Sequence, residues 1–177
     1  TKKDLSVGNG DSFLMWGYLS AAISLAVIVM LLATNDPRYA WLYMVIPIAG
    51  FTVSGIKTYK AKRKSHVAST YASNTINNVW AIISAVFAVY AISCLLHFGE
   101  VRSWNGMFLL GMLLPGIGTY TTGVILKEKS IQICGLLGVV IGTGLLRDFV
   151  CGEQVISIMQ MGQMVLSFVI TLIIPGH

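Results

Sequence analysis

Charged residues are scarce in this chain, and their scarcity indicates its class. Asp, Glu, Lys and Arg make up 11% of the 177 residues, against about 25% in an ordinary soluble domain, while 55% are hydrophobic. All 12 basic and 7 acidic residues fall outside six apolar stretches. A charge at the centre of a membrane helix costs roughly 2.5–3.5 kcal/mol. This segregation therefore predicts an all-α, polytopic integral membrane protein with six transmembrane helices.

Cysteine and histidine are also few, and their spacing fits no metal site. Cys94, Cys134 and Cys151 form no Cys-x-x-Cys pair, and the three histidines have no spacing suited to zinc or to bis-histidine haem. No aspartate, glutamate, lysine or arginine lies inside an apolar stretch, and His97 falls only at the end of one. The lack of an ionisable residue at depth counts against intramembrane catalysis and against ion-coupled transport through a buried carboxylate. We therefore expect no metal, no cofactor and no enzymatic activity.

The net charge of +5 does not indicate nucleic-acid binding, because the basic residues sit in short loops beside apolar helices. Nine of the 12 fall in the N-terminal segment and in the loops after the second and fourth stretches, and three fall in the other loops. By the positive-inside rule both termini are predicted to be cytoplasmic.

The densest basic run lies in the predicted cytoplasmic loop 57–66. It consists of Lys57, Lys60, Lys62, Arg63 and Lys64. Such a run is typical of a topology determinant, and it could also contact anionic lipid headgroups.

The predicted helices group into three hairpins within a single transmembrane domain, residues 1–177. The hairpins cover about 12–56, 79–126 and 131–175, and the helices about 12–33, 39–56, 79–98, 107–126, 131–146 and 155–174. Residues 1–11 are polar and glycine-rich, so we predict a mobile tail there. The polar stretch 65–78 could extend the third helix.

A proline motif recurs in the even-numbered helices and suggests an internal repeat. Three apolar residues precede each of Pro47, Pro115 and Pro175. Pro47 and Pro115 are also followed by a glycine and then by a hydroxyl residue and a second glycine, and this part of the motif is missing after Pro175. A proline within a helix frees the carbonyl four residues earlier, so we expect kinks. The freed carbonyl could coordinate a solute, or a hydroxyl of a neighbouring helix could satisfy it.

Polar groups near these prolines are the candidates for a solute path. The candidate site residues are Pro47, Gly50, Ser54, Pro115, Gly118, Thr119, Thr122 and Gln163. The hydroxyls could equally bond to their own helix or to a neighbour, and an amide such as Gln163 could simply join two helices. The Gly138-x-x-x-Gly142 spacing in the fifth helix predicts close helix packing.

The chain resembles small uncharacterised six-span proteins of bacterial inner membranes in two features. These are the pattern Pro-Gly-x-Gly-x-x-x-Thr-Gly-x-[Ile/Leu]-Leu-Lys at Pro115–Lys127 and the proline near the end of the sixth helix. The resemblance implies an inner-membrane location and no particular activity.

Two functions remain open from the sequence. The first is a transporter, channel or binding protein for a small neutral or amphipathic solute, which should gather the candidate residues around a common interior site. The second is a non-catalytic scaffold or regulatory subunit, with a second copy or another membrane protein as partner in addition to the bilayer. This second function predicts that the glycine face of the fifth helix is left free for the partner.

Overall fold

The computed structural model describes residues 2–34, 45–46, 48, 52, 55–56, 71–96, 101–150 and 158–177. These residues are almost all helical, and one short turn, at Lys127 and Glu128, lies among them. The elements are α1 (Lys2–Thr34), α3 (Tyr71–Leu96), α4 (Val101–Leu126), α5 (Lys129–Val150) and α6 (Ile158–Phe168). A π-helical turn, η2 (Val169–Ile173), continues α6 without a break into α7 (Ile174–Gly176). We call α6, η2 and α7 together the last helix. The predicted all-helical class is confirmed for this part of the chain.

Four of the helices are long and apolar enough to cross a membrane. Their apolar segments are Phe13–Thr34, Tyr71–Cys94, Gly106–Leu126 and Ile158–Gly176, and α5 adds a shorter apolar stretch, Lys129–Gly144. The predicted second helix lies mostly outside the described residues. The structure therefore supports a protein with several membrane-spanning helices, and the count of six and the three-hairpin repeat stay predictions.

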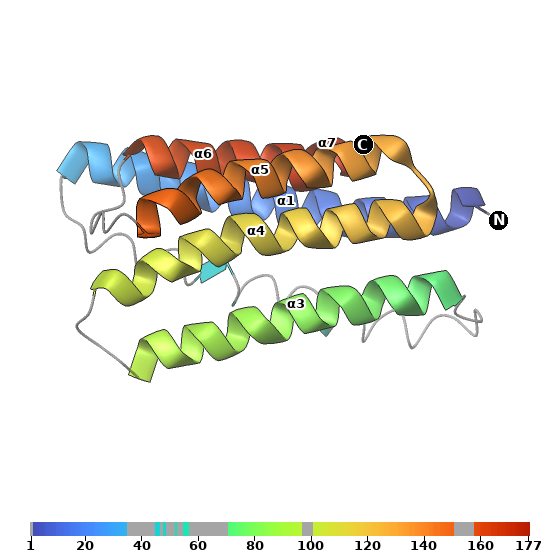
Figure 1. Ribbon diagram of the computed structural model, residues 1–177, viewed down its shortest axis with the longest axis horizontal. Helices are drawn as coiled ribbons and strands as arrows, with labels where there is room; N and C mark the ends of the chain where they lie inside the picture. The colour runs from blue at the N-terminus through green and yellow to red at the C-terminus, as the bar shows by residue number, and fades with distance from the viewer. Residues whose placement is uncertain are drawn as a thin grey trace.

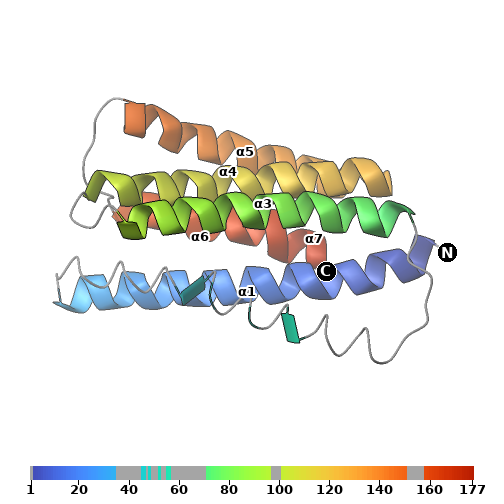
Figure 2. The same cartoon turned by 90° about the horizontal axis from the view of Figure 1, so that it is seen from below.

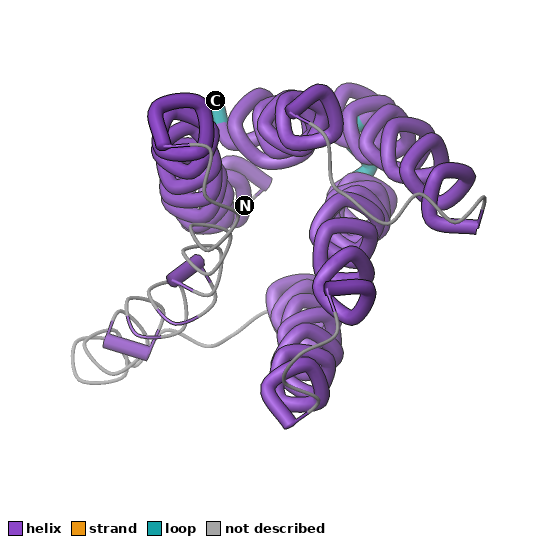
Figure 3. Tube along the Cα trace, turned by 90° about the vertical axis from the view of Figure 1, so that its left-hand side faces the viewer, coloured by secondary structure: helices purple, strands orange, loops and turns teal. Residues whose placement is uncertain are grey.

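The helices lie nearly parallel to one long axis (Figure 1). α6 packs beside α1, α4 and α5, and α3 lies on the far side of α4 (Figures 1 and 2). Seen along the axis, the described helices are arranged in a curved row (Figure 3). The start of α1 and the end of α7 lie at the same end of the bundle, where Leu14 packs against Gly176.

The predicted mobile tail is wrong for the described residues, because α1 begins at Lys2. Once the apolar segment has formed a helix, each further residue adds a hydrogen bond without a new nucleation step. Gly8 and Gly10 weaken the extension by about 1 kcal/mol each, and no proline precedes Pro37 to stop it. The third helix is also extended toward its N-terminus, as the polar stretch before it allowed, and begins at Tyr71.

Glycines bring α4 and α5 into backbone contact, as the spacing in α5 predicts. A Cβ on Gly116 would lie 2.8 Å from the Val139 nitrogen, and one on Gly135 would lie 2.6 Å from the Tyr120 Cα. The turn between the two helices closes at Lys127, whose φ of 58° is left-handed, with the Glu128 N–H donating to the Gly123 carbonyl at 3.0 Å. This is the hydrogen bond of a helix C-cap.

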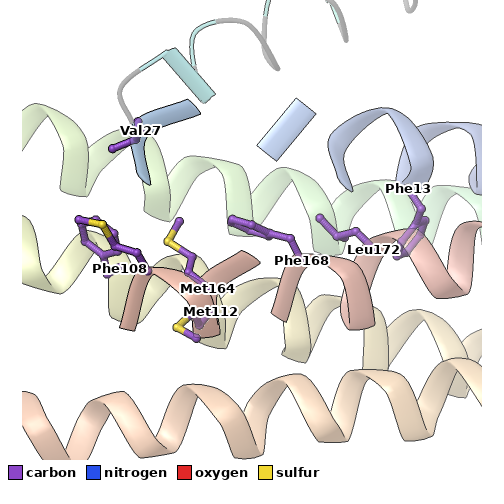
Figure 4. Packing of buried hydrophobic residues seen from close by; sticks show 8 residues of the cluster. Phe13, Val27, Phe108, Met112, Met164, Phe168 and Leu172 are labelled. Carbon is purple, nitrogen blue, oxygen red and sulfur yellow. The ribbon is translucent and has the colours of Figure 1, made fainter. Parts of the chain in front are cut away.

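The buried apolar cluster runs along the faces of α1, α4 and α6 that meet one another. Figure 4 shows Phe108 and Met112 of α4 beside Met164, Phe168 and Leu172 of the last helix. Large apolar side chains on the other faces are exposed, including Val29, Val89 and Val140. Exposed apolar faces of this extent fit a lipid environment.

Candidate functional site

Six hydroxyl side chains are buried inside the bundle and together form what we call the hydroxyl stripe. None is more than 2% exposed. They come from α1, α4 and the last helix: Ser20, Ser24, Thr119, Thr122, Ser167 and Thr171. A core of leucine, isoleucine and phenylalanine alone would have excluded a polar site, whereas this core also contains buried hydroxyl groups.

The serines of α1 occupy core positions of a regular seam. The buried positions Phe13, Gly17, Ser20, Ser24 and Val27 follow alternating steps of four and three residues. This spacing keeps one side of a helix against a neighbouring helix. Both serines therefore face the bundle because of their register and not because of their polarity.

A proline explains the hydrogen bond between α4 and η2. Pro175 has no N–H, so the carbonyl of Thr171, four residues earlier, lacks its α-helical donor. The hydroxyl of Thr119 donates to this carbonyl at 2.8 Å, and the hydroxyl of Thr171 donates in turn to the Ser167 carbonyl at 2.7 Å. The wider π turn ends at Ile173, two residues before the proline, and such turns are frequent at functional sites.

At the end of the bundle where the termini lie, a second chain of hydrogen bonds joins α3 to α4. The indole N–H of Trp80 donates to the Thr122 hydroxyl at 3.2 Å, and this hydroxyl donates to the Gly118 carbonyl at 2.8 Å. The Trp80 ring also meets Phe13 of α1 edge to face, with centroids 5.2 Å apart. We call Phe13, Trp80 and Thr122 the Trp80 layer.

The hydroxyls of Ser24 and Ser167 have no hydrogen-bond partner among the described residues, although they are 0% and 1% exposed. Ser167 is the midpoint of the apolar segment of α6–α7, and Ser24 adjoins the midpoint of the segment of α1. Gly17 contacts Leu172, and continuing this antiparallel register by seven residues places Ser24 level with residues 165–166. Both unpartnered hydroxyls therefore lie at mid-depth of the bundle.

The structure brings together only part of the predicted set. Pro115, Gly118, Thr119 and Thr122 are buried along one side of α4, and Gln163 is half-buried on α6. Outside the described residues lie Pro47, Gly50, Ser54 and the basic cluster Lys57, Lys60, Lys62, Arg63 and Lys64. α4 continues through Pro115 as one helix.

The structure contains both predicted kinds of hydroxyl hydrogen bond, within one helix and between helices. Thr121 and Thr122 bond back to carbonyls of α4, whereas Thr119 bonds across to the last helix. Among the residues that the structure describes, no group of three or more histidine, cysteine, aspartate or glutamate side chains is placed to hold a metal ion.

The sequence had not singled out Ser20, Ser24, Ser167 and Thr171 as site residues. Two signals in the sequence could have identified them. One is the four-three spacing around Ser20 and Ser24, and the other is the separation of Pro175 from Thr171 by four residues. Trp80 is a further residue that the sequence did not identify as part of a site, because its contacts with Thr122 and Phe13 depend on the tertiary structure.

The fold and the site together define a helical protein with apolar outer faces and a polar, uncharged interior stripe. Comparisons with known protein families, with curated proteins and with solved structures found no match.

Proposed function

We propose that the protein is a multi-span membrane protein that binds a small uncharged solute at mid-depth of its helices and allows its passage. The observation that carries the proposal is the pair of unpartnered hydroxyls, Ser24 and Ser167. A buried polar group without a partner costs about 1–3 kcal/mol, so a chain selected for stability alone has little reason to keep two. A solute that hydrogen-bonds to them offsets that loss.

The chemistry of the stripe restricts the solute. Its groups are hydroxyls and the carbonyls of Gly118 and Thr171, which can donate and accept hydrogen bonds but cannot neutralise a charge. No aspartate, glutamate, lysine or arginine occurs in 13–34, 71–96, 106–126 or 158–177. An ion at this depth would be unpaired, and that is strongly unfavourable. Small polyols and amides such as glycerol and urea have the required uncharged hydrogen-bonding groups.

Flux through proteoliposomes tests the proposal. Vesicles containing the full chain should shrink and reswell faster in glycerol or urea than empty vesicles. S24A and S167A should lower this flux, while S84A, which removes a half-buried hydroxyl of α3, should leave it unchanged. Native mass spectrometry of the gently extracted protein should detect a bound solute that the two variants lose.

The stability of the same variants separates binding from folding. Removing an unpartnered hydroxyl should leave the midpoint of thermal unfolding unchanged or raise it. Wild-type flux equal to that of empty vesicles for every uncharged solute would refute the proposal. Equal losses of flux and stability in S24A and S167A would assign the serines to folding instead.

The proposal includes a topology with six spans and both termini in the cytoplasm of a bacterial inner membrane. The end of α1 and the start of α3 lie at opposite ends of the bundle (Figure 1). α1 and α3 therefore run in the same direction, and a further crossing between them accounts for a sixth span. The start of α1 and the turn from α4 to α5 lie at the end with the termini and carry Lys2, Lys3, Lys127 and Lys129, which supports the orientation. Labelling of single cysteines placed in each loop of cells and inverted vesicles tests both statements.

The scaffold alternative gains no support from α5. It predicted a glycine face left free for a partner, but Gly135, Gly138 and Gly142 are buried against Tyr120, Thr171 and Leu113 of the same chain. Gly144 alone of the glycines in α5 has open space around it.

A further inference from the structure

The Trp80 layer lies across one end of the hydroxyl stripe. Phe13 is the first residue of the apolar segment of α1, and Thr122 is one turn from the end of α4 at Leu126. Ser24 and Ser167 lie deeper, at the midpoints of their segments. A solute that approaches the serines from the end where the termini lie must therefore pass the level of Trp80.

The position of the indole depends on a glycine. A Cβ on Gly118 would lie 3.1 and 3.2 Å from the tip of the Trp80 ring, closer than ordinary van der Waals contact. The ring therefore lies against the backbone of α4, with its N–H on the Thr122 hydroxyl and its edge toward Phe13. In this position it links three helices, α1, α3 and α4.

Trp80 also satisfies a group that would otherwise be free for a solute. The Thr122 hydroxyl uses its proton on the Gly118 carbonyl, so its remaining capacity is as an acceptor, and the indole N–H fills that role. A hydroxyl or amide N–H of a solute could replace the indole N–H without leaving Thr122 unpaired.

Of the helices in the layer, α3 is held by the least burial. In its apolar segment 17% of the residues are buried, against 44% in α4. Segments with few buried contacts open at the lowest free energy. Movement of α3 with its Trp80 side chain is therefore easier than movement of α4, and it would open the Trp80 layer.

We infer that Trp80 is the gate residue of the solute site: its indole closes the hydroxyl stripe at the end of the bundle with the termini, and an uncharged solute displaces its N–H from Thr122. This inference rests on the proposed function. Trp80 acts through position and not through chemistry, so its replacement should alter the rate of access and leave the preference for uncharged solutes unchanged.

The test compares W80F with W16F in proteoliposomes of the full chain. W80F keeps an aromatic ring near Phe13 but removes the N–H, and W16F makes the same change at a partly buried tryptophan outside the layer. Loss of one interhelical hydrogen bond corresponds to about a threefold higher glycerol flux in W80F, with no change in W16F. F13L, which removes the edge contact but keeps an apolar side chain, should also raise flux and serves if W80F folds poorly.

A second readout does not depend on flux. With Cys94, Cys134 and Cys151 replaced by alanine, S24C should react with iodoacetamide faster in the W80F background than in the W16F background. Equal labelling, together with equal glycerol flux in W80F and wild type, would overturn the gate while leaving the proposed function standing. Flux at the level of empty vesicles in wild type, W80F and F13L would overturn both.

Discussion

The contact between α4 and α5 at Gly135 allows a quantitative prediction for G135A. An added Cβ would lie 2.6 Å from the Cα of Tyr120 and 2.8 Å from its Cβ. Carbon atoms prefer about 3.5–4.0 Å, so the two helices must separate by about 1 Å at this point. The obstructing atoms belong to the backbone and to a side-chain base, which cannot rotate away as the end of a flexible side chain could.

Separation of the helices also weakens neighbouring contacts in the same interface. Gly116 lies against the backbone of residues 135–139, and Gly123 lies against Ile131 and Gln132. A gap of 0.5–1 Å forfeits roughly a quarter to a half of each dispersion contact. With typical overpacking costs of about 1–3 kcal/mol, we expect G135A to lower the free energy of unfolding by about 2–3 kcal/mol.

The matched control is G144A on the same helix, where an added Cβ meets nothing within 4 Å. Alanine is the better helix former, so G144A should be neutral or up to about 1 kcal/mol more stable than wild type. Unfolding in mixed micelles with increasing dodecyl sulfate, followed by circular dichroism, measures both variants. A G135A protein within about 0.5 kcal/mol of G144A would refute the packing that we describe.

Three further substitutions, T119V, G17A and H177A, test other contacts, and T121V serves as a control for the first. T119V should lower stability by about 0.6–1.7 kcal/mol because the Thr171 carbonyl loses its donor, and T121V, whose hydroxyl bonds only within α4, should change it by less than about half of that in the same assay. G17A should cost less than G135A in the dodecyl sulfate titration, since the atoms nearest to its added Cβ belong to the side chains of Ile173 and Leu172 and the nearest backbone atom is 3.2 Å away, against 2.6 Å for the Tyr120 Cα at G135A. H177A removes the 2.9 Å hydrogen bond to Tyr18, and at this exposed end we expect a loss below about 0.5 kcal/mol; a loss above about 1 kcal/mol would show that the end of α7 holds the bundle together.

The glycines show how far local pattern predicts packing. Gly138 and Gly142 are four residues apart, and this spacing alone predicted a close helix contact, which the structure has between α5 and its neighbours α4 and η2. The sequence did not reveal which neighbours those would be. α4 lies in the second predicted hairpin and α5 in the third, so the close contact crosses the boundary between the proposed repeats.

The N-terminal segment shows where local composition misled. Polar residues and two glycines before Phe13 predicted a tail, but composition measures only the intrinsic cost of each residue. An adjoining apolar helix supplies the nucleus, so α1 extends back to Lys2 despite that cost.

The sequence by itself determined the class of this protein. Charges are absent from the long apolar segments, and a bilayer admits such segments only as helices whose backbone groups are satisfied internally. The tertiary structure decided which polar groups are inside. A membrane helix is apolar on all sides, so its hydrophobicity does not distinguish the lipid face from the interior face. Ser24 and Ser84 look alike in the sequence, and only the packing of α1 against the last helix buries the first completely while the second stays half-buried.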